Sequence, residues 1–277
     1  MTNFSFTTLL IGFLLAVLIS AVAYRLRTLN RSGALAAICL GTIFFGLGGW
    51  GGAALLLGFF ITSSALSRLF RQRKRKLNEK FSKGDERDAA QVFANGGIAG
   101  LFLIVYSIQP GWSWAWAACA GALAAANADT WATELGVLSR RAPRLITTGQ
   151  SVERGSSGGI SLTGTVAASG GALFIGTLAA FFWPTSLSFG NTLLIILLIG
   201  LSGLAGSLAD SLLGATWQAI YTCPSCNKET ERHPLHTCGT PTTQIRGLSW
   251  LNNDWVNTAC TIVGALLSGL LLLLLLR

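Results

Sequence analysis

The stretch NADTWATELGVLSRRAPRLITTGQSVERGSSGG occupies residues 127–159 and joins the polar end of one apolar segment to the start of the next. It places the carboxylates of Asp129 and Glu134 at the end of a candidate membrane span, followed by two arginines and a turn rich in serine and glycine. Ionisable groups are costly inside a bilayer and usually mark a functional site there. Carboxylates can hold a metal ion, arginines can hold phosphate, and N–H groups of a Gly/Ser turn can bind oxyanions. The stretch therefore predicts phosphate chemistry at a membrane surface.

The chain around this stretch has the composition of a membrane protein. Of its 277 residues, 51% are hydrophobic and 11% are charged, and the mean hydropathy is +0.57. Soluble domains carry about 25% charged residues, and about 20 apolar residues suffice to cross a bilayer as a helix. We expect an all-α, polytopic membrane bundle of about eight transmembrane helices. Their expected ranges are 5–24, 33–49, 52–69, 89–107, 113–138, 160–182, 191–220 and 255–276.

Two of these spans leave alternatives open. The second and third are joined only by a Gly/Trp hairpin at 48–52, so they could form a re-entrant pair instead. The first run lacks a basic leading segment and a small-residue cleavage site. It is therefore expected to be a retained helix and not a signal peptide.

The distribution of basic residues predicts the topology. Nineteen of the 20 lysines and arginines fall at 25–31, 68–87, 140–154 and 228–246, whereas the intervening connections contain none. The positive-inside rule assigns these alternate loops to the cytoplasm. We therefore expect both termini outside, an active face on the cytoplasmic side, and a location in the cytoplasmic (inner) membrane of the cell.

The domain organisation is expected to be simple. We predict one membrane domain over 1–277, with a Cys/His-rich cytoplasmic loop at 221–250 inserted between the last two spans. The basic run RQRKRK at 71–76 is interpreted as an orientation signal that also touches anionic lipid. No aromatic residues interleave it, so we expect no nucleic-acid partner.

The carboxylates of residues 127–136 cannot all share one helix face. Asn127, Thr130 and Glu134 form one stripe of an ideal helix, and Asp129 lies about 150° away from that stripe at about 100° per residue. Either the helix breaks near 132–136, or the two acids have different partners. Salt bridges to Arg140 or Arg141 would make both acids structural, and this alternative stays open.

Two further acids are candidate metal ligands. Asp210 lies deep in an apolar span, in the triplet Ala-Asp-Ser, which echoes Ala-Asp-Thr at Asp129. A buried carboxylate without a partner would be protonated, so a metal ion or a cation is its natural neighbour. A structural hydrogen bond between helices is the alternative. Asp254 follows Asn252 and Asn253 before the last span, where helix capping explains one of the three.

Two polar segments suit phosphate groups. Arg87, Gln91 and Asn95 have i, i+4 spacing and form a polar ridge that enters the fourth span, although snorkelling and helix packing would also explain it. Ser156, Ser157 and Gly158 lie in the loop that opens the next helix near 160, where unpaired N–H groups bind phosphate oxygens. The loop is not a Walker A sequence. The alternative is a flexible loop without a binding function, in which a serine caps the next helix.

The Cys/His-rich loop has the ligand types of a structural zinc site. Cys223 and Cys226 are spaced as CxxC, and His236 and Cys238 follow as His-x-Cys. A disulfide is less compatible with a cytoplasmic location. We therefore predict that these four residues bind zinc as a staple for the loop, with His233 as the competing fourth ligand.

The motifs QVFANGG (91–97), NADTWATELG (127–136), TGQSVERGSSGGISLTGT (148–165) and RGLSWLNNDWVN (246–257), together with the Asp210 span, resemble the transmembrane protein 19-like family. The resemblance covers nearly the whole chain. The best understood members of this family are phytyl-phosphate kinases of tocopherol biosynthesis. A looser likeness connects the Asp129 segment and the Gly/Ser loop to CTP-dependent dolichol and phytol kinases.

The resemblance implies a membrane kinase. Such an enzyme would transfer the γ-phosphoryl group of a nucleoside triphosphate, with CTP as the expected donor, to a phytyl- or geranylgeranyl-type isoprenyl monophosphate, and would need Mg²⁺. Asp129, Asp210 and Asp254 would hold Mg²⁺, with Glu134 in an outer position. The other implied roles are phosphate binding by Arg87, Arg140, Arg141, Arg154, Gln91, Asn95, Asn127 and Asn253, and donor binding by Ser156, Ser157 and Gly158.

Two other functions stay open. A cytidylyltransferase that makes a CDP-lipid would need the same metal and nucleotide, and would release pyrophosphate. A secondary transporter would use acids near the membrane midplane for ion coupling. The polar motifs lie on one face and the outer loops are uncharged, which disfavours the transporter.

Overall fold

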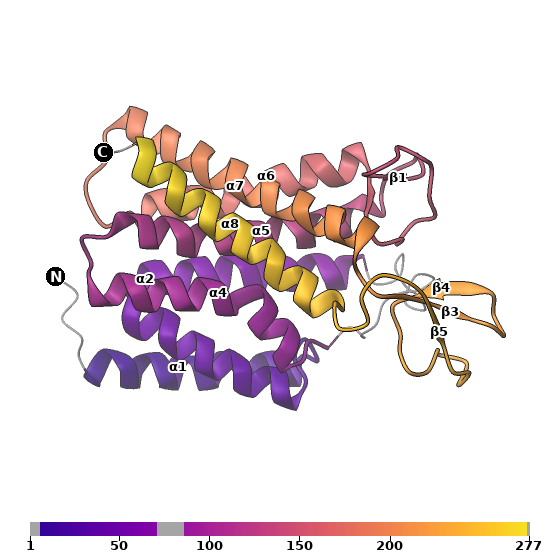
Figure 1. The fold of residues 1–277 in the computed structure, drawn as a ribbon. Helices are drawn as coiled ribbons and strands as arrows, with labels where there is room; N and C mark the ends of the chain where they lie inside the picture. Colours follow the sequence, from indigo (N-terminus) through magenta and orange to yellow (C-terminus); the bar gives the residue numbers. More distant parts are fainter. Residues whose placement is uncertain (1–5, 71–85, 276–277) are drawn as a thin grey trace.

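The computed structural model describes residues 6–70 and 86–275, so the basic run at 71–76 lies outside the described residues. Seven helices form the body of this part of the chain (Figure 1). They are α1 (Phe6–Arg25), α2 (Arg31–Leu69), α4 (Ala89–Ile108), α5 (Ser113–Gly136), α6 (Leu162–Phe181), α7 (Phe189–Thr216) and α8 (Asn253–Leu275). All of them except α5 are long and apolar enough to cross a membrane.

Helix α2 covers both the second and the third expected span. Gly49 interrupts it with φ 57° and ψ −148°, a backbone conformation that glycine adopts without the steric cost of a side chain. Gly52 lies against the backbone of Phe44, so the chain turns back on itself and α2 consists of two arms. The arms agree with the sequence boundaries at 33–49 and 52–69. The number of membrane crossings, expected to be about eight, stays a prediction.

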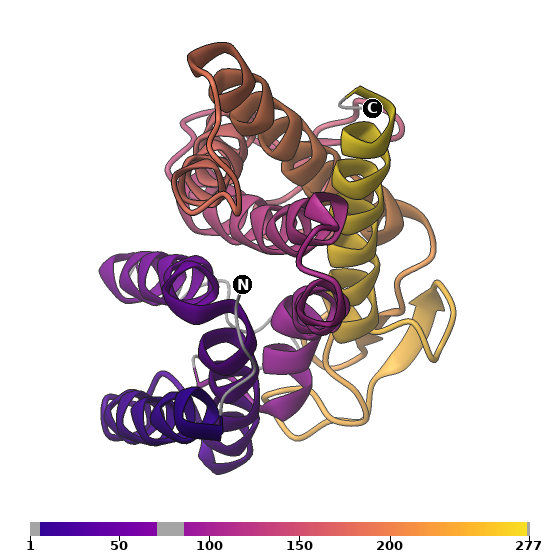
Figure 2. The same ribbon diagram turned by 90° about the vertical axis from the view of Figure 1, so that its left-hand side faces the viewer.

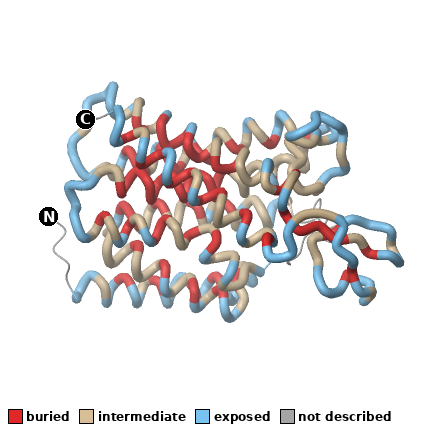
Figure 3. The backbone as a smooth tube through the Cα atoms, viewed as in Figure 1, coloured by how far each residue is buried: buried red, intermediate tan, exposed pale blue. Residues whose placement is uncertain are grey.

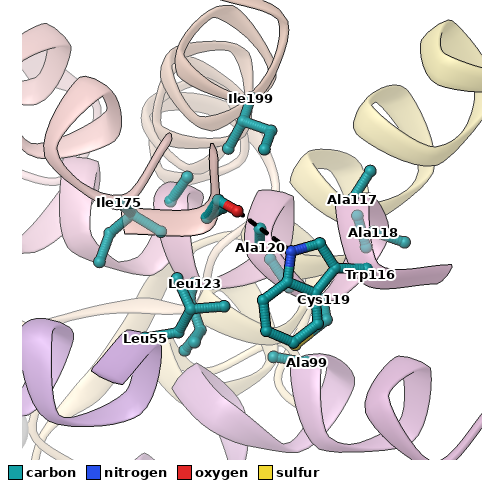
Figure 4. Packing of buried hydrophobic residues seen from close by; sticks show 14 of the residues in the cluster. Leu55, Ala99, Trp116, Ala117, Ala118, Cys119, Ala120, Leu123, Ile175 and Ile199 are labelled. Atoms are coloured by element: carbon teal, nitrogen blue, oxygen red, sulfur yellow. Dashed lines mark hydrogen bonds between the residues drawn. The ribbon is translucent and has the colours of Figure 1, made fainter. Parts of the chain in front are cut away.

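Helix α5 lies at the centre of the bundle. Every residue from Ala115 to Ala128 is buried, and the helix contacts α2, α4, α6, α7 and α8 (Figure 3). A helix that is apolar on all sides belongs inside a bundle. Its sole large side chain in this buried run apart from Leu123 is Trp116, whose Nε1 donates to the carbonyl of Ala179 at 3.3 Å (Figure 4). The many alanines make α5 thin enough for five partners to surround it.

Small residues set the distance between α5, α7 and α8. A Cβ on Gly206 of α7 would lie 2.5 Å from Ala125 Cβ and 2.7 Å from the carbonyl oxygen of Cys260. Gly203 packs in the same way against Ala124. Close contact of this kind is the usual means of holding membrane helices together. The glycine face of α7 therefore receives two other helices, α5 and α8.

The described chain is mostly helical but not entirely so, which modifies the all-α expectation. The strands β1 (Arg144–Leu145) and β2 (Gly159–Ile160) pair within the loop between α5 and α6. The strands β3 (Ile220–Cys223), β4 (Lys228–Thr230) and β5 (Thr243–Arg246) form an antiparallel sheet in the order β4-β3-β5 between α7 and α8. The sheet lies within the Cys/His-rich loop. Its short strands and turns bring the cysteines and His236 close together.

All these strands lie at one end of the bundle, which we call the site end, and the start of α1 and the end of α8 lie at the opposite end (Figure 1). The location of both termini outside the membrane, which the charge pattern predicts, stays a prediction. Which side of a membrane the site end faces stays a prediction, as does the identity of that membrane.

Candidate functional site

A polar cavity of about 340 Å³ opens at the site end, between the ends of α2, α4, α5, α6, α7 and α8. Of the residues singled out from the sequence, those that line it are Arg87, Gln91, Asn95, Asp129, Glu134, Arg154, Ser156, Ser157, Gly158, Asp210 and Asn253. Residues from motifs more than 150 positions apart thus meet in one place. We call this space the polar cavity.

The directions of the helices give the polar cavity a defined electrostatic pattern. Helices α4, α6 and α8 begin at the site end, and their first turns contribute Gln91, Thr165 and Asn253 to the lining. Helix N-termini carry partial positive charge and bind phosphate. Helices α5 and α7 end there, and helix C-termini favour cations. The cavity therefore offers places for both anions and a cation.

Asp129 of α5 and Asp210 of α7 both line the polar cavity. Each lies about 10 Å before the end of its helix, at a rise of about 1.5 Å per residue. The two carboxylates interact electrostatically, and Asp210 also interacts with Glu231. Like charges repel strongly away from water, and a cation between the two carboxylates would relieve that repulsion.

Asp210 has an oxygen that lacks a hydrogen-bond partner within the described parts of the chain. Its Oδ2 is buried and accepts no hydrogen bond from any of these residues. Buried polar atoms are nearly always satisfied, and a site for an ion explains such an exception. The structural interhelical hydrogen bond that the sequence left open is not seen for this oxygen.

Asp129 and Glu134 have different partners on an unbroken helix. Helix α5 continues to Gly136, so the alternative of a break near 132–136 is wrong. Glu134 Oε1 accepts a hydrogen bond from Ser67 Oγ at 2.7 Å, and the carboxylate interacts with the charge of Arg87. Glu134 therefore organises the wall of the polar cavity next to α2, whereas Asp129 lies towards α7.

The ridge of Arg87, Gln91 and Asn95 lines the polar cavity as predicted. The guanidinium of Arg87 donates to Ser64 Oγ at 3.1 Å. Burial lowers the pKa of Arg87, and the charge of Glu134 opposes that shift. An arginine nevertheless keeps its charge in a protein, so it can offset a phosphate group. Gln91 also forms a capping box with Asp88, which fixes the start of α4.

The Gly/Ser loop reaches the polar cavity and is tied to the sheet. Ser157 Oγ donates to Glu231 Oε1 at 2.7 Å, and Gln218 Nε2 donates to the same oxygen at 2.9 Å. Ser161, not a residue of the Gly/Ser run, caps α6. The N–H groups of Ser156 and Gly159 donate to carbonyls inside the loop, so fewer N–H groups face outward than the sequence led us to expect.

Sequence reasoning missed Gln218 and Glu231, which both line the polar cavity. They lie at the two ends of the β3–β4 hairpin. Gln218 falls at the end of the span expected at 191–220 but lies beyond α7, and Glu231 lies outside every expected span. Only the folding of that hairpin brings Glu231 beside α7 and the Gly/Ser loop. The only signal in the sequence was the charge of Glu231, five residues after the CxxC motif. Its spacing from other polar residues does not match any known site.

Gly158 offers a stability test of the loop. It has φ 82°, and a Cβ there would lie 2.5 Å from the backbone nitrogen of Ala215. We expect Gly158→Ala to lower the melting temperature and the ligand affinity of the polar cavity, because the loop must move away from α7. The matched control is Gly149→Ala, with φ 69° and no atom within 4 Å of its Cβ. The left-handed conformation alone costs about 1–2 kcal/mol, so equal losses would contradict this interpretation.

Four residues predicted to bind phosphate or metal lie elsewhere. Asn127 is fully buried and joins α5 to α6 through the carbonyl of Gly171 at 2.8 Å, and it accepts from Thr62 of α2 at 3.1 Å. Its amide is used to link helices, because Asn127 lies about two turns deeper in the bundle than Glu134, on the same stripe of α5. Arg140 and Arg141 are exposed and do not line the polar cavity.

Asp254 is the fourth of these residues. It lies in the first turn of α8, where its N–H donates to Asn252 Oδ1 at 3.0 Å, and the polar cavity is lined instead by its neighbour Asn253. Helical geometry turns consecutive side chains by about 100°, so both cannot face the same space. Asn252 acts as the cap that the sequence allowed. The structure therefore does not bring Asp254 to the aspartate pair.

The described residues contain one group of three or more potential ligands with converging atoms, and it is the predicted zinc set. The ligand atoms of Cys223, Cys226, His236 and Cys238 all lie within 4.8 Å of one another. The competing ligand His233 instead stacks on Tyr221, with ring centroids 4.6 Å apart. Hydrogen bonds with Thr240 and His236 lower the pKa of the Cys238 thiol to about 5. Three thiols and one imidazole form a typical structural zinc site, so the residues fit this metal.

Comparison with known proteins shows the family of this chain. The model of the integral membrane protein DUF92 family matches residues 14–265. The chain belongs to the DUF92 family. It is 33% identical over 280 residues to Protein PGR of Arabidopsis thaliana, covering 95% of each chain. An uncharacterized membrane protein of Methanocaldococcus jannaschii is 34% identical over 265 residues, covering 95% of this chain and 94% of its relative.

A third relative, an uncharacterized membrane protein of Synechocystis, is 26% identical over 82% of this chain and 76% of its own length. No solved structure matches the chain. These findings confirm the family relationship that the motifs indicated and a multi-pass integral membrane protein. The names of these three relatives state no reaction and no substrate.

Proposed function

We propose that this DUF92 protein is a Mg²⁺-dependent kinase that transfers the γ-phosphoryl group of a nucleoside triphosphate, with CTP as the expected donor, to an isoprenyl monophosphate. The observation that carries the proposal is the polar cavity, which combines a half-buried aspartate pair with Arg87 and Arg154 at the end of a membrane bundle. Phosphoryl transfer requires positioning and neutralisation of charge more than covalent participation of the protein. The cavity contains the groups that such chemistry needs.

The aspartates fit a magnesium ion. Mg²⁺ is usually held by one or two carboxylates together with substrate phosphates, so the pair Asp129 and Asp210 is sufficient and a third protein ligand is not needed. The buried, unsatisfied Oδ2 of Asp210 is consistent with this role. When bound, Mg²⁺ would neutralise charge on the phosphate oxygens of the donor.

The remaining groups bind and orient the two phosphates. Arg154 is anchored by a hydrogen bond from Nη2 to the carbonyl of Ser139 at 2.7 Å, so its charge is held at the cavity wall. We assign Arg154, Ser156 and Ser157 to the donor, because they lie on the loop that faces α7. Arg87, Gln91 and Asn95 lie across the cavity and are assigned to the acceptor. The acceptor phosphate is itself the nucleophile, so no strong general base is required.

Product analysis tests the proposal. Purified protein in detergent would be given Mg²⁺, geranylgeranyl monophosphate and each nucleoside triphosphate in turn, and the products would be identified by mass spectrometry. We expect the isoprenyl diphosphate and a nucleoside diphosphate, and loss of both in Asp129→Asn. A CDP-lipid with pyrophosphate would assign the protein to the cytidylyltransferases. Absence of turnover with every pair would overturn the kinase proposal, and transport in proteoliposomes would then be measured.

We propose in addition that the Cys/His group binds a structural zinc ion. The zinc would hold the sheet that delivers Glu231 and Gln218 to the polar cavity. The same sheet is connected to α7 by Arg246, which donates to the carbonyls of Ala215 at 2.7 Å and Gly214 at 3.0 Å. This zinc would have no part in phosphoryl transfer itself.

A further inference from the structure

A second cavity, of about 250 Å³, lies between α1, the two arms of α2 and α4. Its lining is almost entirely apolar and includes Leu15 and Ile19 of α1, Leu40 and Phe44 of the first arm of α2, and Leu57 and Phe60 of the second arm. Figure 2 shows α1 and α2 grouped on one side of the bundle, next to α4. We call this space the apolar cavity. Its volume lies just below the usual range for ligand pockets, about 300–1,000 Å³.

The two cavities share their polar boundary. Arg87, Gln91 and Asn95 are the only residues that line both the polar and the apolar cavity within the described ranges 6–70 and 86–275. Apart from Ser20, they are also the only polar side chains of the apolar cavity among these residues. The ridge identified in the sequence therefore separates a hydrocarbon compartment from a phosphate compartment.

Arg87 is held at this junction by contacts on its apolar side. Its guanidinium carbon lies 6.0 Å from the ring centroid of Phe59 and 5.9 Å from that of Phe60. Its Nη1 donates to Ser64. These contacts hold the guanidinium of Arg87 at the end of the apolar cavity that borders the polar cavity. The charged end of an amphiphile bound in the apolar cavity would lie there.

The shape of the apolar cavity suits a chain and not a compact group. From Phe60 at the junction to Trp50 near the hairpin is ten residues, or about 15 Å along the helix at about 1.5 Å per residue. Trp50 lines the far end, and its side chain is 72% exposed. A long tail can therefore enter beside the hairpin or extend past it into the bilayer.

We infer that the apolar cavity is the binding site for the hydrocarbon tail of a lipid monophosphate, whose phosphate lies at Arg87, Gln91 and Asn95 facing Asp129 and Asp210. The inference rests on the proposed function for the phosphate headgroup of the occupant. It adds the location of the tail, the route by which the lipid enters, and the residues that select tail length. The residues around the tail belong mainly to α1 and α2. Within the described residues, α2 contributes only Ser67 to the lining of the polar cavity and α1 contributes none.

Photocrosslinking tests the location without requiring turnover. The probe is an isoprenyl monophosphate with a diazirine near the end of its tail, added to wild-type protein in nanodiscs and mapped by mass spectrometry. We expect adducts on α1 and the two arms of α2, competed by unlabelled isoprenyl monophosphate. Adducts on lipid-facing residues of α6 or α7 would overturn the inference. Equal labelling by the matching isoprenyl alcohol, which lacks phosphate, would also overturn it, because the cavity would then be a general lipid crevice.

A pair of neighbouring leucines tests the selection of tail length. Leu15 lines the apolar cavity, whereas Leu14 does not line it and is 58% exposed. We expect Leu15→Trp to lower kcat/KM for the long-tailed geranylgeranyl monophosphate by about tenfold or more, a typical effect of misfit in an apolar pocket. Its kcat/KM for short-tailed dimethylallyl monophosphate should not change. Leu14→Trp should change neither by more than about twofold.

The outcomes separate this inference from the proposed function. Crosslinks in the apolar cavity without diphosphate formation would support the lipid site and overturn the kinase. Diphosphate formation with crosslinks elsewhere would support the kinase and overturn the tail site. Equal loss in Leu14→Trp and Leu15→Trp, or loss with both tail lengths, would contradict a role for Leu15 in tail selection.

Discussion

Asp210→Asn should abolish phosphoryl transfer while leaving the protein folded. We expect kcat to fall by roughly 10²-fold or more, the usual effect of removing one group that stabilises charge in a transition state. The melting temperature in detergent should stay the same or rise, because Asp210 interacts with the like charges of Asp129 and Glu231. The same substitution should also raise the Mg²⁺ concentration needed for half-maximal turnover of any residual activity.

The combination of these readouts distinguishes an ion ligand from a structural acid. A structural carboxylate would lose stability on becoming an amide, whereas a ligand held close to other carboxylates would not. The control is Glu229→Gln, a carboxylate-to-amide change on the exposed strand β4 that should affect neither activity nor stability. A lowered melting temperature with unchanged kcat in Asp210→Asn would contradict the metal role.

His236→Ala should remove zinc from the protein and greatly reduce its activity. Structural zinc contributes about 10–16 kcal/mol of apparent binding energy in isolated zinc-finger peptides, so one missing ligand should release most of the metal. Glu231 and Gln218 then lose their fixed positions beside Ser157, and a displacement of about 1 Å can cost about 10²-fold in rate. Zinc would be measured by mass spectrometry of the purified protein, and order in the segment 217–252 by limited proteolysis.

His233 supplies the matched control for this experiment. It lies three residues from His236 but stacks on Tyr221, so His233→Ala should retain about one zinc per chain. The helical content of both variants, measured by circular dichroism, should match that of the wild type, because the Cys/His group lies outside the helices. Equal zinc content in the two variants, or a wild-type protein with a Cys223–Cys238 disulfide and no zinc, would overturn the zinc proposal.

Local sequence information was sufficient for most of the helices. The apolar runs predict α1, α4, α6, α7 and α8 to within a few residues, because a segment in lipid must satisfy its backbone hydrogen bonds internally. The reversal at Gly49 follows from a glycine-rich hairpin that only a positive φ can close. The sheet β4-β3-β5 was not predicted, because its strands are short and their pairing depends on contacts distant in sequence.

Part of the candidate site was also predictable from local sequence. Asp129, Asp210, Arg87 and the Gly/Ser loop stand out because polar residues are rare in this chain and each has few local alternatives. Asn127 stands out equally but serves packing, and nothing in its neighbours indicates this before α6 is placed beside it. Glu231 does not stand out, since it lies among other polar residues of an exposed loop.

The sequence by itself determined that this chain is a membrane-embedded helical bundle with its polar chemistry at one end, because hydrophobicity and charge act on each segment independently. Only the tertiary structure decided which polar residues meet. Close packing through Gly203 and Gly206 brings Asp129 and Asp210 to one cavity, and the folded sheet adds Glu231. The turn at Gly49 places α1 and the two arms of α2 around the apolar cavity, beside the polar cavity. Such convergence depends on distances between helices, which a linear pattern does not contain.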